Sequence, residues 1–281
     1  MIKVCIRGGF GNQLFEYACG YMLAKKNHVG LQLEVSEYDY ITWPSLGLDK
    51  LNLVYDALIT YHRGHSVLNR AVLNKLRKVK AVGLGTKWIN PPKTAVAFEE
   101  RILELGDHIY LQGNFQNIRY FESELPELRK MITPNYQQET EVQKYLEQTE
   151  NTQSVGVHIR RGDYVKIGCT MAPKYYREAI RLLSERIVHA EFFVVSDDIE
   201  YCKDLLGETE NTHFVSVSTK NKDLDEFFIL KSCRHQIISN STFSWWAAVL
   251  NTYEKKIIVA PAEDMWDQEF CLPGWILIGS R

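Results

Sequence analysis

The stretch VGVHIRRGDY, residues 155–164, gives the first indication of the fold. Its apolar residues alternate as they do in a strand, and it ends in two arginines, a glycine and an aspartate. Outward from it, further strands are expected at 191–196, 213–217, 236–239 and 256–260, with helical stretches between them. This alternation predicts a doubly wound α/β domain, whose ligands bind beyond the carboxyl ends of the strands.

The N-terminal half begins with a related pattern. IKVCI, residues 2–6, is typical of a short buried strand, and a glycine-rich turn at 8–11 precedes a helix. A second strand is expected at 29–35 and another at 108–113. Strand, turn, helix and strand in this order predict the first βαβ unit of a parallel sheet.

The length and composition indicate a folded protein of two domains. The chain has 281 residues, 45% hydrophobic and 24% charged, and a domain takes about 150 residues. The polar run EQTENTQ at 147–153 suggests a boundary, with an N-terminal domain at 1–150 and a C-terminal domain at 151–281. A net charge of -2 creates no general attraction for nucleic acid, so we expect no nucleic-acid partner, and an anionic ligand would need locally placed cations.

Cysteine usage and the first residues predict a cytoplasmic protein. The six cysteines form no C-x-x-C pair, which disfavours a zinc site and a disulfide framework. Lys3 and Arg7 interrupt the apolar run that a signal peptide would need, and no later stretch approaches the roughly 18 apolar residues of a membrane span.

A basic stretch in the N-terminal half has two interpretations. It is either a solvated helix face or a peripheral contact with an anionic inner-membrane surface, which would suit a lipid-linked acceptor. Its basic residues are Arg70, Lys75, Arg77, Lys78 and Lys80.

The end of the strand at 155–160 carries the most specific chemistry. Two-residue alternation places His158 and Arg160 on one face, and an arginine fork matches phosphate oxygens. Arg161 is expected to point the opposite way and to pair with Asp163. The alternative is a purely structural cluster of ion pairs.

Two other strand ends offer polar groups. In FFVVSDD, residues 192–198, Asp197 is a ligand candidate, although Ser196 or Asp197 capping the next helix explains the motif equally well. In IISNSTFSWWAAVL, residues 237–250, four small polar residues precede a helix whose N-terminal amides favour an anion. This predicts a diphosphate cradle, against the alternative of an N-cap followed by a tryptophan core anchor.

Metal and cofactor signals are weak. Asp223 and Asp225 form a D-x-D pattern that metal-dependent glycosyltransferases also carry, but carboxylates at a helix start are the commoner explanation. The eight histidines show no H-E-x-x-H spacing, and there is no phosphate-binding P-loop or complete dinucleotide fingerprint. We therefore expect neither a metal ion nor a cofactor.

Four stretches together resemble glycosyltransferase family 11, the inverting α-1,2-fucosyltransferases. They are GGFGNQLFEYACGYMLA (8–24), HIRRGDYV (158–165), FFVVSDDIEYCK (192–203) and IISNSTFSWWAAVL (237–250), and they span nearly the whole chain. The His-x-Arg of the second stretch is shared with α-1,6- and protein O-fucosyltransferases, so the α-1,2 linkage rests on the whole set. The resemblance implies a GT-B-like α/β fold, with two Rossmann-like domains facing a cleft, the acceptor on the first and GDP-fucose on the second.

The resemblance also implies roles for individual residues. Arg160 would grip the β-phosphate, residues 241–244 the diphosphate and Asp225 the guanine edge, while Asn12 reaches the donor. The acceptor would be a galactose-containing glycan. The candidate catalytic residues are Arg160, His158 and Asp163, and the candidate substrate-binding residues are Gly11, Asn12, Gln13, Arg161, Asp197, Asp225, Asn240, Ser241, Thr242, Phe243 and Ser244.

The proton acceptor for the sugar hydroxyl is left open among three residues. Asp163, Glu16 and His158 are the candidates, and Glu16 stands where the family usually has glutamine. Two other functions are kept open: a fucosyltransferase of another linkage, such as α-1,6, and a GDP-sugar-binding protein without turnover.

Overall fold

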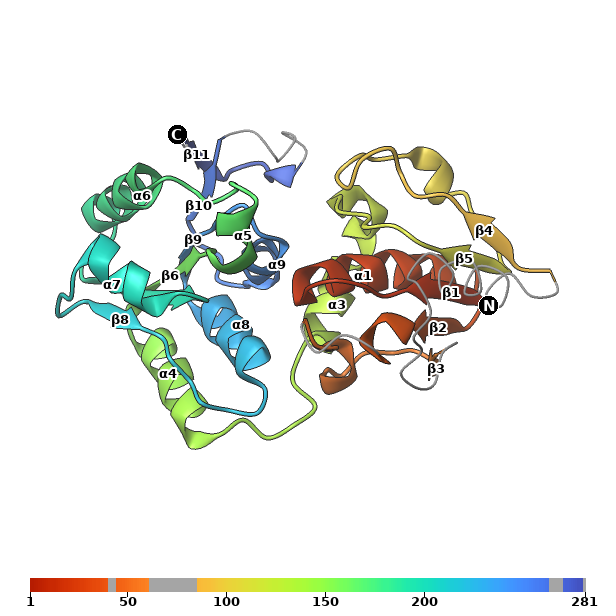
Figure 1. Cartoon of the computed structure of the whole chain (residues 1–281), viewed down its shortest axis with the longest axis horizontal. Helices are drawn as coiled ribbons and strands as arrows, with labels where there is room; N and C mark the ends of the chain where they lie inside the picture. Colours follow the sequence, from red (N-terminus) through yellow and green to blue (C-terminus); the bar gives the residue numbers. More distant parts are fainter. Residues whose placement is uncertain (40–43, 61–84, 263–269, 280–281) are drawn as a thin grey trace. The chain divides into compact units, whose positions relative to one another are not determined.

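A computed structural model of the protein describes residues 1–39, 44–60, 85–262 and 270–279. The chain divides into two compact units, Met1–Tyr136 (unit 1) and Gln137–Arg281 (unit 2). Each unit contains one parallel β-sheet with helices packed on it (Figure 1).

The sheet of unit 1 has five parallel strands in the order β3-β2-β1-β5-β4. The strands expected at 2–6, 29–35 and 108–113 are confirmed. Strands β3 and β4 were not predicted from the sequence. The strands are β1 (Ile2–Cys5), β2 (Leu31–Glu34), β3 (Ala57–Ile59), β4 (Lys87–Ile89) and β5 (Ile109–Leu111), and the α-helices are α1 (Phe10–Lys26) and α3 (Leu125–Met131).

Helix α1 is the central helix of unit 1 and is buried along most of its length. Gly8, at a φ of +70°, makes the turn between β1 and α1, a conformation that glycine adopts without strain. A Cβ atom at Gly20 would lie 2.2 Å from Cγ2 of Val4, so a glycine is needed where α1 packs on β1. Short 3-10 turns complete the unit at Ser36–Asp39, Leu48–Lys50, Glu100–Ile102, Ile118–Tyr120 and Glu122–Glu124.

The sheet of unit 2 has six parallel strands in the order β11-β10-β9-β6-β7-β8. All five strands expected here are confirmed, and only the three-residue β11 was missed. The strands are β6 (Gln153–Ile159), β7 (Ala190–Ser196), β8 (Thr212–Phe214), β9 (His235–Ile237), β10 (Ile258–Pro261) and β11 (Ile276–Ile278). The helices are α4 (Thr140–Asn151), α5 (Gly162–Lys166), α6 (Pro173–Arg186), α7 (Ile199–Leu206), α8 (Lys222–Ser232) and α9 (Thr242–Leu250).

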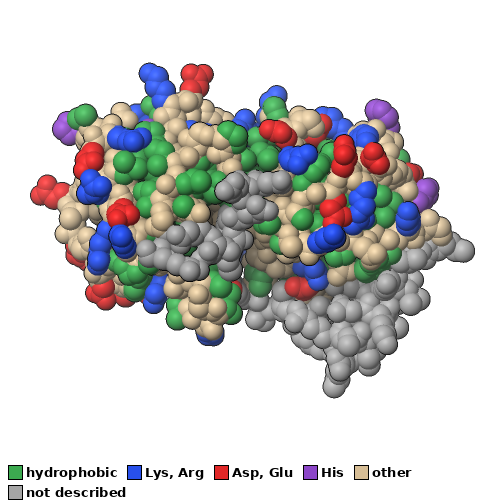
Figure 2. Space-filling view, turned by 90° about the horizontal axis from the view of Figure 1, so that it is seen from above, with side chains coloured by type: hydrophobic (Ala, Val, Ile, Leu, Met, Phe, Trp, Pro, Cys, Tyr) green, Lys and Arg blue, Asp and Glu red, His purple; other side chains and the backbone are tan. Residues whose placement is uncertain are grey.

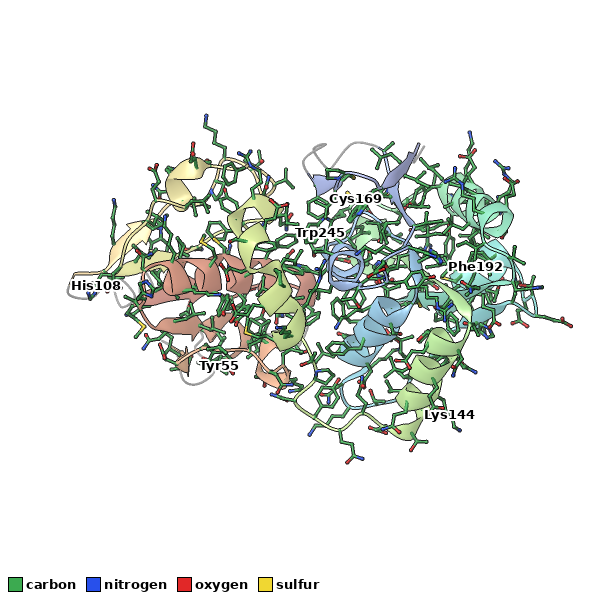
Figure 3. All side chains as sticks on the ribbon, turned by 180° about the vertical axis from the view of Figure 1, so that it is seen from behind. Tyr55, His108, Lys144, Cys169, Phe192 and Trp245 are labelled. Carbon is green, nitrogen blue, oxygen red and sulfur yellow. The ribbon has the colours of Figure 1, made fainter. Side chains whose placement is uncertain are left out.

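Helices cover both faces of this sheet, as expected for a doubly wound domain. Helices α6 and α7 lie on one face, and α4, α8 and α9 lie on the other (Figure 1). The alternation predicted for β6 is confirmed, because Val155, Val157 and Ile159 join one core cluster with Tyr175 of α6 and Phe192 of β7 (Figure 3).

The boundary between the units differs from the one expected at 150/151. The run 147–153 is the end of α4 and the start of β6, and its polar groups bind within unit 2. Thr149 Oγ1 lies 2.7 Å from Ser232 Oγ, and an Arg234 Nη2 donates to the carbonyl of Glu150 at 2.8 Å. The structure therefore moves the boundary to Tyr136 and Gln137.

The surface of the described residues mixes both signs of charge. On the face in Figure 2, acidic and basic side chains are interspersed. Within the described ranges, every helix is too short or too polar to cross a membrane. The basic stretch with Arg70, Lys75, Arg77, Lys78 and Lys80 lies outside the described residues, so its membrane contact stays a prediction.

Candidate active site

The order of the strands in unit 2 creates a crevice at one place in the sheet. The chain proceeds from β6 through β7 to β8 on one side, and then returns to add β9 on the other side of β6. At such a switch point the connections leave in opposite directions, and ligands bind beyond the strand ends there. The residues after β6 and β9 include the candidates predicted from the sequence, and a 2.9 Å hydrogen bond between His158 Nδ1 and Ser239 Oγ links the two strand ends.

His158 is buried and held as a neutral group. Burial, and secondly the positive charge of Arg160, lowers the pKa of His158 to about 3. Its ring lies 5.1 Å from the ring of Phe243, which lies 5.3 Å from Phe227. A histidine with this pKa is a weak base at neutral pH, so the geometry favours a positioning role for His158 over proton transfer.

Arg160 lies between two carboxylates. Its Nη2 donates to Asp163 Oδ1 at 2.6 Å, and its Nη1 lies 2.8 Å from Asp197 Oδ2. One fifth of the Arg160 side chain is exposed, so the guanidinium is accessible at the strand end. An arginine held in a fixed orientation is preorganised to receive an anion.

The pairing expected between Arg161 and Asp163 is wrong. The chain enters α5 directly after β6, and the helical turn brings Asp163 back to Arg160 three residues earlier. Arg161 instead lies 3.6 Å above the ring of Tyr201 on α7, with its Nε 3.4 Å from Asp198 Oδ2. Strand alternation stops applying where the strand ends, and the two arginines face different partners.

The two aspartates of the Ser-Asp-Asp motif after β7 make different contacts. Asp198 is the N-cap of α7 and accepts the backbone N–H of Tyr201 at 3.2 Å. The cap expected at Ser196 or Asp197 is therefore one residue further on. Asp197 accepts the backbone N–H of Arg161 at 2.8 Å and pairs with Arg160, so it belongs to the arginine cluster.

Helix α9 begins at the switch point, directly beyond β9. Ser241 is its N-cap residue and makes no side-chain capping hydrogen bond, and the first turn contains no acidic residue. Thr242 and Phe243 are partly exposed there. An uncapped helix N-terminus beside an arginine suits a diphosphate.

Ser244 and Asn240, on either side of this N-terminus, make hydrogen bonds to the backbone. The hydroxyl of Ser244 is fully buried and donates to the carbonyl of Ser241 at 3.2 Å, so the diphosphate contact expected of Ser244 is not supported. Asn240 Nδ2 donates to the carbonyl of Cys169 at 2.8 Å. Trp245 (Figure 3) is buried and donates to the carbonyl of Phe270, so the core anchor coexists with the helix terminus.

Asp223 and Asp225, the two aspartates of the D-x-D pattern in α8, differ in their surroundings. Asp225 is buried, and its oxygens accept hydrogen bonds from Thr219 Oγ1 at 2.5 Å and from Gln138 Nε2 at 3.4 Å. Both contacts lie within unit 2. Asp223 is exposed, so the two aspartates of the D-x-D pattern do not share an environment. The described residues contain no cluster of His, Cys, Asp and Glu suited to a metal ion.

Glu226 was missed by the sequence reasoning. It is 7% exposed, and its Oε1 accepts no hydrogen bond from the described residues, with Lys222 Nζ at 3.7 Å. Burial raises the pKa of Glu226 to about 7, against the opposing charge of Lys222. The sequence does contain an indication, because Glu226 lies inside the apolar run LDEFFIL. Burying a charged carboxylate costs free energy, so such a residue is a candidate for a functional site.

Unit 1 has a corresponding switch point between β1 and β5, where a pair of side-chain amides lies. Asn12, in the first turn of α1, accepts a hydrogen bond from Gln116 Nε2, beyond β5, at 3.0 Å. Gly11 beside it is buried in the helix. Asn12 therefore lies beyond the end of β1, and its contact with a ligand stays a prediction.

Gln13 is a structural residue, contrary to the role expected of it. Its Nε2 donates to the carbonyls of Gly8 at 3.0 Å and Ser45 at 2.8 Å, and its Oε1 accepts from the backbone of Gly47 at 2.9 Å. Both the amide nitrogen and the amide oxygen of Gln13 therefore hydrogen-bond to the backbone, and the residue is fully buried.

Glu16 is likewise unsuited to act as a base. It is fully buried, and its Oε2 accepts the backbone N–H of Arg7 at 2.7 Å. A glutamine oxygen can accept the same bond, which explains why either residue fits this position.

Comparison with known proteins agrees with this arrangement. The profile of glycosyl transferase family 11 matches residues 97–279. The chain belongs to this family. It is therefore a glycosyltransferase. An α-1,2-colitosyltransferase of Escherichia coli is 29% identical over 97% of both chains, and the O-antigen biosynthesis glycosyltransferase WbnK of Escherichia coli is 28% identical over 92% of both.

Solved structures share the fold at low identity. The fucosyltransferase NodZ from Bradyrhizobium superposes with a TM-score of 0.51 at 13% identity, covering 89% of this chain and 92% of NodZ. The FUT1 protein of Arabidopsis thaliana gives a TM-score of 0.52 at 12% identity, covering 92% of this chain and 70% of that one. The expected family and the GT-B fold class are confirmed.

Proposed function

We propose that this family 11 enzyme transfers L-fucose from GDP-β-L-fucose to a galactose hydroxyl of a glycan, forming an α-1,2 linkage with inversion. The observation that carries the proposal is that Arg160, at the end of β6, and the N-terminus of α9, beyond β9, share the switch point of unit 2. The relatives whose names specify transfer to position 2 of a sugar, including a galactoside 2-α-L-fucosyltransferase of Mus musculus at 28% identity over 54% of this chain, support the linkage.

In this proposal unit 2 binds the nucleotide. The diphosphate lies between Arg160 and the first turn of α9, where Ser241 and Thr242 contribute backbone N–H groups. The guanine edge, with its adjacent N–H donors, pairs with the buried carboxylate of Glu226. We assign this role to Glu226 because the oxygens of Asp225 already accept hydrogen bonds from Thr219 and Gln138.

The reaction exchanges one bond at the anomeric carbon of fucose for another. The bond from C1 to the β-phosphate oxygen breaks, GDP leaves with the bonding electrons, and the acceptor oxygen bonds to C1 from the opposite face. Negative charge grows on the departing diphosphate, and Arg160 with the helix amides stabilises that charge without reorganising. In this proposal Arg160 and the helix N–H groups take the place of a divalent metal ion.

Asp163 is the best placed of the three candidate bases. Its side chain is half exposed at the end of β6, whereas His158 and Glu16 are buried and engaged. Arrival of the diphosphate offers Arg160 a competing anion, which frees Asp163 to accept the proton of the sugar hydroxyl.

The test is to incubate the protein with GDP-fucose and a panel of galactosides, and to locate the new linkage by NMR. We expect fucose on O2 of galactose. Transfer to another position would replace the proposed linkage, and turnover only with the GDP ester of colitose would replace the proposed donor. An Arg160→Ala variant, assayed in parallel, excludes a contaminating activity.

A further inference from the structure

Asp197 joins the ends of two neighbouring strands. Strands β6 and β7 pair in register up to Ile159 and Ser196, so Asp197 is the first residue beyond the ladder. Its Oδ1 accepts the backbone N–H of Arg161 at 2.8 Å, and its Oδ2 lies 2.8 Å from Nη1 of Arg160. One carboxylate therefore fixes both the main chain after β6 and the side chain that precedes it.

Gly162 lies against the same carboxylate. A Cβ atom at this position would stand 2.4 Å from Asp197 Oδ2 and 3.3 Å from its Cγ, and no other described residue beyond its chain neighbours comes within 4 Å. The φ of Gly162 is outside the left-handed region, so the backbone conformation does not require glycine. Within the described part of the chain, Asp197 is the one group that a side chain at 162 would meet.

From this geometry we propose that Asp197 is a positioning residue, which aims the guanidinium of Arg160 at the diphosphate, and that Gly162 is glycine to leave room for it. The inference rests on the proposed role of Arg160. Asp197 acts on Arg160 and needs no contact with the substrate. A displacement of about 1 Å of a catalytic group can cost about 10²-fold in rate, so a slack Arg160 should lower kcat more than it weakens the donor complex.

The first experiment compares two adjacent carboxylates. Asp197→Asn keeps an oxygen for the N–H of Arg161 but removes the charge that holds Arg160, and kcat should fall by about tenfold or more, with a smaller change in KM for the donor. Asp198→Asn is the matched control, since asparagine also caps helices, and its kcat should stay within about twofold of wild type. Equal rates in the two variants would overturn the proposal.

The second experiment is a double-mutant cycle between Gly162→Ala and Asp197→Ala. Alone, Gly162→Ala should displace Asp197 and lower kcat. In the Asp197→Ala background the added methyl meets nothing, so Gly162→Ala should cost nothing further. Multiplicative losses would show that Gly162 and Asp197 act independently and would overturn the inference.

Two controls separate this inference from the proposed function and from misfolding. The cycle is repeated on GDP affinity by calorimetry, so that it remains readable if the donor sugar or the linkage is not the proposed one. Thermal melts accompany every variant. If Gly162→Ala fails to fold, recovery of the fold in the double variant still supports the clash with Asp197, and failure of both variants while Asp197→Ala folds would contradict it.

Discussion

Each unit has a switch point beside its first strand, and the two switch points differ in chemistry. In unit 1 the first strand, β1, is flanked by β2 and β5, and in unit 2 the first strand, β6, is flanked by β7 and β9. Beyond β1 lies a glycine turn with the amide pair of Asn12 and Gln116. Beyond β6 lies Arg160 with its two carboxylate partners, and beyond β9 begins α9, whose N-cap residue makes no side-chain capping hydrogen bond. Under the proposed function the diphosphate binds at the second of these, where Arg160 lies.

The largest effect is expected at Arg160. Lysine keeps the charge but loses the planar fork that binds two phosphate oxygens. Arg160→Lys should therefore lower kcat by on the order of 10²-fold, with a smaller loss of GDP affinity. Initial rates and calorimetric titration with GDP check both.

Arg161→Lys is the internal control for this variant. Arg161 packs on Tyr201 and pairs with Asp198, so its replacement should reduce thermal stability before it reduces turnover. A greater catalytic loss in Arg161→Lys than in Arg160→Lys would mean that the phosphate contact belongs to the other arginine.

The next effect distinguishes the neighbouring carboxylates of α8. Glu226→Gln removes an acceptor from the proposed guanine contact and should weaken GDP binding by about 1.5–3 kcal/mol, the usual contribution of a hydrogen bond to a charged group. Asp225→Asn should leave the affinity nearly unchanged and lower the melting temperature, because Asp225 binds Thr219 and Gln138. Calorimetry on both variants decides between them, and the reverse pattern would restore Asp225 as the guanine reader.

The ionisation of Glu226 predicts a pH dependence. Only the charged carboxylate accepts both guanine N–H groups, and its pKa is about 7, with Lys222, Asp223 and Asp197 as the charges that act on it. GDP affinity should therefore rise about tenfold between pH 6 and pH 8. The Glu226→Gln variant measures the contribution of the phosphates themselves, and identical profiles in the two proteins would exclude Glu226 from the contact.

The same pKa has the opposite effect on stability. Burial raises the pKa of Glu226 above its ordinary value of 4.5, so the folded state binds more protons than the unfolded state between that value and about pH 7. This contribution to the free energy of unfolding is present at low pH and is lost as the pH rises through 7. Thermal melts at pH 8 should show Glu226→Gln to be more stable than wild type, and a less stable variant would contradict a costly buried charge.

Substitutions in unit 1 are expected to change GDP affinity little. Gln13→Ala breaks three buried contacts of the turn at 8–9 and the loop at 45–47, and should lower the melting temperature by several degrees while GDP affinity stays constant. Asn12→Ala should likewise spare GDP affinity, because the nucleotide is proposed to bind unit 2. A large loss of GDP affinity in either variant would place the nucleotide on unit 1.

The smallest effect is expected from metal removal. The diphosphate is neutralised in this account by Arg160 and by helix amides, and the described residues offer no metal-ligand cluster. EDTA should leave the rate unchanged. Loss of activity that manganese or magnesium restores would assign a metal to the donor complex.

The sequence predicted the fold well where patterns are long. The seven-residue β6 and β7 and the parallel sheet expected in each unit followed from periodicity, whereas β3, β4 and β11 were not predicted. The boundary was missed because the polar residues at 147–153 looked like a linker, whereas they hydrogen-bond to other residues of unit 2, as Thr149 does to Ser232 and Ser154.

For the site, motifs indicated the strand ends but not the side-chain partners. Asp163 pairs with Arg160 because α5 starts immediately after β6, which alternation cannot anticipate. Asp225 and Glu226 are adjacent in sequence, and only the structure shows which one has its oxygens occupied. The structural role of Gln13 depends on a loop more than thirty residues away, beyond the reach of a local motif.

The most direct test of the central claim is hydrogen–deuterium exchange of the full-length protein with and without GDP. If the nucleotide binds at the switch point of unit 2, GDP should slow exchange in peptides covering 158–163 and 240–244 and leave the peptide covering 8–12 unchanged. Arg160→Lys, measured in the same way, should show weaker protection at both unit 2 segments. Protection at 8–12 without protection at 158–163 and 240–244 would contradict the account, because the nucleotide would then be bound at the switch point of unit 1.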